Sequence, residues 1–352
     1  MGSIDVAALL APLSAEAPAG QDMSSSGEYL ELFTLAAGKP ERVMGEKTLP
    51  AEDPNWAEVH DRCVEILGKT KDLRVQVQLL VAALKTRGLP GLADALRLMQ
   101  GTLEQFWGPM FPRLDPEDNN DPLERINIIA GLAIPAETFG DPLKVIRRIR
   151  EAPLANSRQL GRFGLRDIAL ASGEIPPPND PNFKPPTTQL IEGAFADTTL
   201  EDLQATHRAA VDSLAAVAGI DAFLDTTVGA SKSPDLGPIT KALTEAKTCL
   251  ERYLAKRGVG EAPAEADSAG GGSSGAGPSL SGEVRSTGDV LLAIDRICQY
   301  YERNEPSSPV PLLLRRAQRL VSKDFLEIIK DLNPDALEQI HKISGTSDTT
   351  PS

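Results

Sequence analysis

Aromatic residues, cysteine and histidine are scarce in this 352-residue chain. Phe, Trp and Tyr together make up 4% of it, and it holds three cysteines and three histidines. Because aromatic and β-branched runs favour strands, their scarcity favours helix packing over sheets. The cysteines at 63, 249 and 298 are far apart and odd in number. We therefore expect buried, reduced thiols and a cytoplasmic protein rather than a disulfide framework.

The chain also lacks the residue groupings that enzymes and cofactor sites need. Its dispersed histidines offer no Ser/His/Asp or Cys/His arrangement. Residues 68–70, Gly-Lys-Thr, resemble the end of a phosphate-binding loop, but Cys63 stands where that motif needs glycine. His60 and Cys63 could supply only two of the ligands of a zinc site, so a buried thiol beside a partly exposed imidazole is favoured. The sequence predicts no catalytic, cofactor-binding or metal-binding residue, and no cofactor.

Basic residues are outnumbered, and long apolar runs are missing. The chain has 36 Lys and Arg against 50 Asp and Glu, a formal net charge of −14. Attraction to phosphate needs clustered basic residues, so we expect no nucleic-acid partner. The apolar runs fall short of the ~20 residues of a membrane span, and no signal-peptide pattern is visible, so we expect no direct membrane insertion. The 41% of apolar residues still supports real cores.

The stretch from residue 55 to residue 133 is the best patterned part of the chain. Residues 55–67 carry a single apolar stripe and predict an amphipathic helix. Residues 72–84 are apolar nearly all round, which predicts a helix covered on every side. Residues 88–91, Gly-Leu-Pro-Gly, predict a turn, and a third helix is expected to follow and to end at Trp107-Gly108-Pro109.

Several separated blocks of residues follow one another here in a recognisable order. They begin at Trp56 and Lys71-Asp72-Leu73-Arg74-Val75, continue through Gly88–Asp94, Phe106-Trp107 and Pro112–Asp118, and end at Asp121-Pro122-Leu123 with Arg125 and Asn127. This order resembles the N-terminal domain of the ImpA/TssA family of the bacterial type VI secretion system, over roughly residues 5–175. The resemblance implies a motif core made of Trp56, Lys71, Asp72, Leu73, Arg74, Gly88, Gly91, Leu92, Trp107, Pro112, Arg113, Asp115, Asp121 and Pro122.

The tripeptide Asp-Pro-Leu occurs at residues 121–123 and again at 141–143. In each copy the Asp is a predicted N-cap and the Pro a predicted first helical residue, so each should begin a helix. We expect the first helix to bury Leu123 and the second to turn its basic residues outward. Such a run is usually solvated or paired with nearby Glu, and a docking patch for an acidic protein is the alternative. The basic residues are Lys144, Arg147, Arg148 and Arg150.

The sequence predicts an all-α, multi-domain protein. Its composition divides the rest of the chain into segments. Residues 38–53 are polar and predict an exposed loop, and a capping box at Thr198 and Glu201 predicts the start of a long helix. Two apolar seams predict a helical hairpin that packs on the first domain or on another subunit. The expected segments are an N-terminal helical domain (1–175), a Pro-rich linker (176–186), the hairpin (187–257), a flexible Gly/Ser/Ala linker (258–286), a C-terminal helical oligomerisation domain (287–345) and a tail (346–352).

The C-terminal domain is expected to self-associate. About sixty residues are marginal for an independent core, and oligomerisation is the usual remedy. The block Glu305-Pro306-Ser307-Ser308-Pro309-Val310-Pro311 and the runs after it resemble the C-terminal segment of the baseplate branch of the same family. The expected interface residues are Tyr301, Pro306, Ser308, Pro309, Pro311, Leu313, Arg315, Arg316, Phe325 and Ile328.

Two functions stay open from the sequence. The resemblance implies a non-enzymatic cytoplasmic scaffold that works with the type VI baseplate and helps to initiate or coordinate assembly of the tube and contractile sheath. Ring-like homo-oligomers are known for the family, so the expected partners are further copies of this chain and the baseplate, tube and sheath proteins. The alternative is a monomeric or dimeric helical adaptor that binds a partner helix or peptide.

Overall fold

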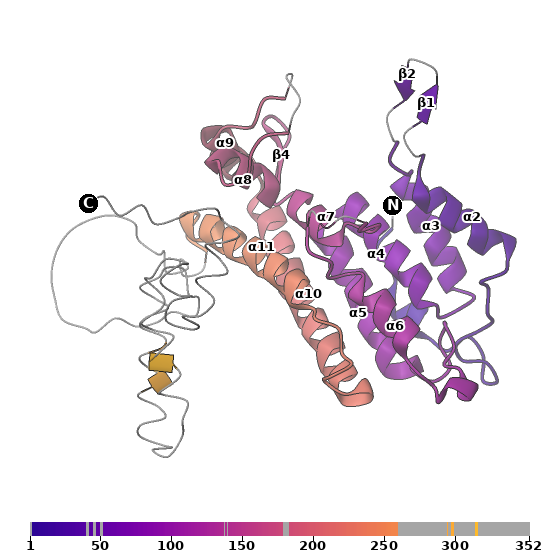
Figure 1. Ribbon diagram of the computed structural model, residues 1–352. Helices are drawn as coiled ribbons and strands as arrows, with labels where there is room; N and C mark the ends of the chain where they lie inside the picture. The colour runs from indigo at the N-terminus through magenta and orange to yellow at the C-terminus, as the bar shows by residue number, and fades with distance from the viewer. Residues whose placement is uncertain are drawn as a thin grey trace, which may run out of the picture. The chain divides into compact units, whose positions relative to one another are not determined.

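The computed structural model describes residues 2–39, 42–44, 47–49, 52–136, 138, 140–178 and 183–259, and the isolated residues 294, 297, 298, 314 and 315. The chain divides into two compact units, Met1–Ala266 and Asp267–Ser352. All the helices and strands named below belong to the first unit, which is mostly helical (Figure 1).

Three helices form the centre of the first unit, as the apolar patterns predict. They are α3 (Trp56–Leu67), α4 (Leu73–Arg87) and α5 (Leu89–Phe106), and α4 packs against both of the others. Two N-terminal helices, α1 (Val6–Leu10) and α2 (Gly27–Ala37), precede them and contact α5 and α3 respectively. The predicted helices of residues 55–106 are confirmed.

Helix α4 is covered on every side. Each residue from Leu79 to Leu84 is buried, and six consecutive helical residues point in all directions around the axis. The predicted four-residue turn after α4 is wrong, because Gly88 alone separates α4 from α5. Gly88 has φ +66°, a conformation that glycine adopts without strain, and Pro90 fits the first turn of α5.

The two Asp-Pro-Leu copies do not begin helices in the predicted way. At α6 (Leu123–Ala130) Pro122 takes the N-cap position without a side-chain cap, and Leu123 is 56% exposed. At α7 (Val145–Glu151) the helix begins after Lys144, whose φ of 50° is left-handed and therefore outside the helix. Asp141 caps the preceding turn instead, since its Oδ1 accepts the backbone N–H of Lys144 at 2.9 Å.

The expectation of an all-α fold needs one correction, because two short antiparallel strand pairs are present. Strands β1 (Arg42–Met44) and β2 (Lys47–Leu49) lie within the predicted loop of residues 38–53. Strands β3 (Ala155–Ser157) and β4 (Gly161–Phe163) precede α8 (Leu165–Ser172), and their register pairs Asn156 with Arg162. Strands of three residues are too short to produce a readable alternation of polar and apolar residues.

The predicted hairpin is present, with one more helix before it. Thr198 ends the additional helix, and the side chain of Thr199 caps the next one by accepting the N–H of Asp202 at 3.1 Å. The predicted capping box of Thr198 and Glu201 is therefore one residue early. The three helices are α9 (Thr188–Asp197), α10 (Leu200–Val228) and α11 (Gly237–Lys256).

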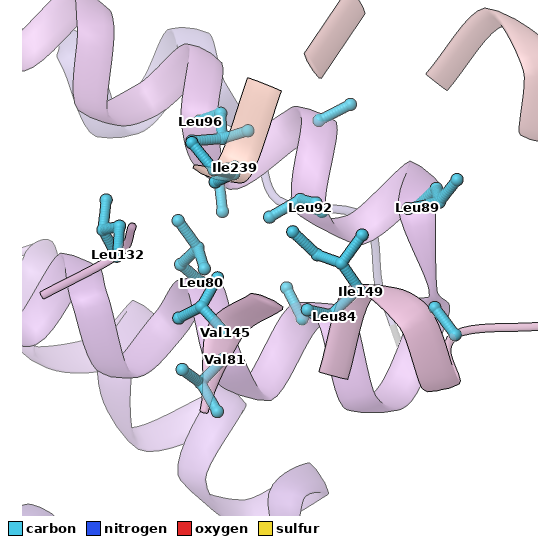
Figure 2. Packing of buried hydrophobic residues seen from close by; sticks show 14 of the residues in the cluster. Leu80, Val81, Leu84, Leu89, Leu92, Leu96, Leu132, Val145, Ile149 and Ile239 are labelled. Carbon is cyan, nitrogen blue, oxygen red and sulfur yellow. The ribbon is translucent and has the colours of Figure 1, made fainter. Parts of the chain in front are cut away.

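The hairpin packs on the preceding helices, which is one of the two expected arrangements. Helix α10 lies along α5 (Figure 1), and the rings of Trp107 and Phe223 meet edge to face with centroids 5.6 Å apart. Figure 2 shows Ile239 of α11 among buried side chains of α4, α5 and α7. One apolar cluster therefore extends through the N-terminal helices and the hairpin. The labelled members are Leu80, Val81, Leu84, Leu89, Leu92, Leu96, Leu132, Val145, Ile149 and Ile239.

Candidate functional site: buried motif residues and a polar pocket

Lys71 ties two other segments to the start of α4. Its side chain is buried, and its Nζ donates a hydrogen bond to the carbonyl oxygen of Leu9. Its backbone N–H donates to the carbonyl of Ala19, and its own carbonyl accepts the N–H of Phe111, both at 2.8 Å. Burial lowers the pKa of the Lys71 ammonium. This motif lysine thus holds the N-terminal segment and the loop after α5 in place.

Asp72 and Arg74 form a compact pair at the beginning of α4. The Asp72 carboxylate accepts the backbone N–H of Arg74 at 2.8 Å as an N-cap, and its other oxygen pairs with Arg74 Nη2 at 2.7 Å. The hydrogen bonds that the Arg74 guanidinium donates to the Asp72 carboxylate raise the pKa of Arg74. The Arg74 guanidinium also lies 5.4 Å from the ring centroid of Tyr29 in α2. This pair therefore joins α2 to α4.

Arg125 holds the loop between α5 and α6. The residue is 1% exposed, and its guanidinium donates to the carbonyl oxygens of Trp107, Met110 and Pro112, the last at 2.8 Å. The guanidinium carbon also lies 4.9 Å from the Trp107 ring centroid. Burial, with a smaller contribution from Arg113, lowers the pKa of Arg125 to about 10. Arg125 belongs to the motif blocks, and its hydrogen bonds hold the backbone of the loop between α5 and α6 in one conformation.

The glycine and leucine members of the motif serve helix packing. A Cβ atom added to Gly91 would lie 2.3 Å from the carbonyl oxygen of Ala83, so α4 and α5 approach too closely there for any side chain. Leu73 and Leu92 are completely buried in the same core. Gly91, Leu73 and Leu92 therefore stabilise the fold and offer no surface to a ligand.

Four motif residues lie at the surface of the segment after α5. Arg113, Asp115 and Asp121 are exposed, and Pro122 is half-buried. Asp115 Oδ1 accepts the backbone N–H of Glu117 at 2.8 Å and caps the short 3-10 helix η1 (Pro116–Asp118). Asp121, expected as an N-cap, does not fill that position. The structure therefore places these four apart from the buried members of the motif.

The predicted basic patch on α7 is largely engaged within the chain. Lys144 is exposed, whereas Arg147 and Arg150 are half-buried. Arg147 Nε pairs with Glu151 at 2.9 Å, and Arg150 Nη1 pairs with Glu245 of α11 at 2.9 Å. The expectation that this face points outward is wrong for Arg150, which reaches across to α11, whereas the Arg147 side chain is 39% exposed and pairs along its own helix. Pairing with glutamates was one of the two interpretations left open, and the docking role stays a prediction.

Arg148 is turned toward the motif tryptophan rather than toward solvent. Its guanidinium carbon lies 4.5 Å from the ring centroid of Trp56, close enough for a cation–π contact. Burial lowers the pKa of Arg148, and nearby Asp53 opposes this shift. Together with Arg150, it fixes α7 against α3 and α11.

The cysteines and histidines lie apart. All three cysteines are buried thiols, as predicted, and burial raises the pKa of Cys249 to about 11. His60 is only 4% exposed, so the expectation of a partly exposed imidazole is wrong. Its Nδ1 lies 3.0 Å from Asp61 Oδ1, while His207 Nε2 lies 3.3 Å from Glu251 Oε1. Within the described residues, no group of three or more His, Cys, Asp and Glu side chains could hold a metal ion.

Of the C-terminal interface residues expected from the sequence, only Arg315 is described. It is helical and half-buried. The following lie outside the described residues: Tyr301, Pro306, Ser308, Pro309, Pro311, Leu313, Arg316, Phe325 and Ile328.

A polar pocket of about 250 Å³ opens where the α4–α5 junction meets the β3–β4 hairpin and the start of α10. Its wall includes Lys85, Arg87 and Arg162, with Asp202 as the single acidic lining residue. The sequence did not predict this pocket, since its residues come from segments more than a hundred positions apart and share no motif. Further polar wall residues are Thr86, Asn156, Thr198 and Thr206.

None of the helices in the described part of the chain is long and apolar enough to cross a membrane.

The sequence model of the family described as "ImpA, N-terminal, type VI secretion system" matches residues 10–133. The chain is also 38% identical, over 359 residues, to the type VI secretion system component TssA1 of Pseudomonas aeruginosa. The match covers 97% of this chain and 98% of that relative.

A solved structure is also similar. It is the N-terminal domain, including the conserved ImpA_N region, of the TssA component of the type VI secretion system from Burkholderia cenocepacia. The TM-score is 0.58 at 22% sequence identity, and the match covers 74% of this chain and 97% of that one. At this identity the likeness concerns the fold alone. With a relative 38% identical along nearly its whole length, the chain belongs to the ImpA/TssA family.

Proposed function

We propose that this protein is a non-enzymatic structural component of a type VI secretion system. In this proposal it is a cytoplasmic, baseplate-associated scaffold that helps to initiate or coordinate assembly of the tube and contractile sheath. The observation that carries the proposal is the 38% identity to a type VI secretion component, TssA1, along 97% of this chain and 98% of the relative. A match of that extent spans both compact units rather than one shared domain.

The placement of the charged motif residues supports a structural role. Lys71, Asp72 and Arg125 are at most 1% exposed, and their hydrogen bonds hold loops and a helix end within the chain. Charged groups that perform chemistry on a substrate need access to it. These residues instead hold segments of the first unit in fixed positions, which a docking domain requires.

The proposed mechanism is multivalent. Residues 287–345 form a homo-oligomer, and the linker at 258–286, with a root-mean-square span of about 30 Å, presents several N-terminal units from it. Weak contacts to baseplate, tube or sheath proteins then add through effective concentration. The segment boundaries predicted from composition, including the Pro-rich linker at 176–186 and the hairpin at 187–257, are part of this proposal.

The test compares the full chain with a chain ending at Gly260, by light scattering after gel filtration. We expect a large, defined oligomer for the full chain and a monomer or dimer for the shortened one. In cells, deletion of residues 287–352 should abolish sheath assembly. A monomer in both samples would favour the adaptor that binds a partner helix or peptide, and normal sheath assembly without residues 287–352 would refute the mechanism.

A further inference from the structure

The polar pocket between the α4–α5 junction and β4 has two basic residues whose charges are already matched. Lys85 Nζ lies 3.4 Å from Asp53 Oδ2, and Arg87 Nη1 lies 2.8 Å from Asp94 Oδ2. Both occupy the last turn of α4, where positive charge offsets the negative end of the helix dipole. The positive charges of these two residues are therefore largely neutralised by their carboxylate partners.

Arg162 differs from them. It is exposed, and its Nε donates to the neutral Asn156 Oδ1 at 3.0 Å. Among the described residues it has no carboxylate partner within 4.0 Å, so its two Nη groups are available. An arginine fork binds a carboxylate through two parallel hydrogen bonds, which makes the pair both strong and specific in geometry.

The beginning of α5 adds a second favourable feature to the pocket. Gly88 is the N-cap residue of α5. Because glycine has no side chain, this end of the helix carries no side-chain cap hydrogen bond. A Cβ atom added to Gly88 would meet nothing within 4 Å, so the backbone there is open to an approaching group. Gly88 and Pro90 line the pocket at the start of this 18-residue helix, where the positive end of the helix dipole favours a negative charge.

We propose that this pocket binds an acidic side chain of an extended peptide segment on a protein partner, with Arg162 as the anchor. This inference rests on the proposed function as a scaffold and names the chemistry of one partner. A single carboxylate fits better than a phosphate, because Arg162 supplies the one uncompensated positive charge among the basic wall residues and Asp202 in the wall repels a more highly charged group. A volume of about 250 Å³ suits a side chain rather than a whole nucleotide.

The experiment uses the full chain and a fluorescein-labelled tetraglutamate peptide, with tetraglutamine as its neutral counterpart. It measures fluorescence anisotropy at about 0.15 M salt, where charges more than about 8 Å apart are largely screened. We expect the glutamate peptide alone to bind. Arg162→Glu should weaken binding at least about tenfold. The affinity of Arg162→Lys should lie between those of the wild type and Arg162→Glu, since lysine keeps the charge but lacks the forked guanidinium. Asp202→Asn should strengthen binding, because it removes the repelling carboxylate.

Arg158→Glu is the matched control. Arg158 lies in the turn of the same hairpin, is exposed and does not line the pocket, so the substitution makes the same change in net charge elsewhere. It should alter binding less than about twofold. Equal weakening by both variants, or no binding of tetraglutamate, would overturn the proposal. Displacement of the peptide by inorganic phosphate at far lower concentration than by acetate would overturn the choice of a carboxylate.

The peptide measurement is independent of secretion, so the two proposals can fail separately. A chain that forms its oligomer and supports sheath assembly but does not bind tetraglutamate refutes the pocket alone. A chain that binds tetraglutamate through Arg162 but plays no part in sheath assembly refutes the scaffold function. Circular dichroism of each variant checks that the fold is retained.

Discussion

Lys71 and Arg125 carry positive charges inside the protein and direct their donors to backbone carbonyl oxygens. In the described residues neither is paired with a carboxylate. Buried polar groups cost about 1–3 kcal/mol each when they lose their partner. Arg125 therefore stabilises a loop that has no regular secondary structure to hold it, and the Lys71 side chain fixes the end of α1.

Replacement of Arg125 by Met should be strongly destabilising. It leaves the carbonyls of Trp107, Met110 and Pro112 without their donor, so we expect the free energy of unfolding to fall by about 3–5 kcal/mol. Urea unfolding followed by tryptophan fluorescence measures the change. Arg113→Met, in the same segment but exposed, is the control and should cost less than about 1 kcal/mol. Similar losses for both variants would contradict the assigned role of Arg125.

Lys71 should make stability rise with pH on the alkaline side. Burial lowers its pKa in the folded protein below the ordinary value of 10.5, so in the interval between the two values the unfolded chain binds more protons. The energetic cost of this charge is thus complete below the folded pKa and disappears as pH rises through the unfolded one.

The measurement compares the wild type with Lys71→Met. The difference in their free energies of unfolding, determined from about pH 7 to about pH 10, should shift in favour of the wild type as pH rises. Taking the difference cancels the titration of Arg125 and other groups. A difference that stays constant with pH would show that Lys71 does not titrate with a lowered pKa.

At the scale of elements, the helices α4 and α5 approach each other closely at Gly91. Gly91→Ala would place a Cβ atom 2.3 Å from the Ala83 carbonyl, so the helices must separate and about 1–3 kcal/mol of stability should be lost. Gly68→Ala is the control. Gly68 has helical dihedral angles, and its added Cβ would be 3.4 Å from the nearest atom, so that variant should be neutral or slightly stabilised. Thermal melts of both variants measure these changes in stability. A Gly91→Ala variant more stable than the wild type would contradict the close packing of α4 against α5.

At the scale of the whole molecule, the hairpin and the N-terminal helices should unfold together because they share one apolar cluster. Phe223→Ala removes the ring that meets Trp107, and we expect a loss of about 1–3 kcal/mol. Hydrogen exchange should then show protection falling equally in α4 and α10. Val211→Ala, on α10 but 38% exposed, should change little. Loss of protection in α10 alone would mean that the hairpin is an independent unit.

The sequence by itself determined the helices with long apolar patterns and the family. Helices α3, α4, α5, α10 and α11 were predicted because a stripe or an all-round apolar segment is a local property of ten or more residues. The family followed from separated blocks, whose order is far more specific than a single short motif. The predicted buried thiols likewise depended only on the residues around each cysteine.

The tertiary structure alone decided where the charges go. Arg150 pairs with Glu245 ninety-five positions away, Arg148 turns to Trp56, and the pocket gathers residues from α4, β4 and α10. The short strands, the caps at Pro122 and Thr199, and the single-residue turn at Gly88 were also missed. Partners distant in the chain leave no local pattern, and a cap shifts by one residue at little cost, so neither can be derived from spacing.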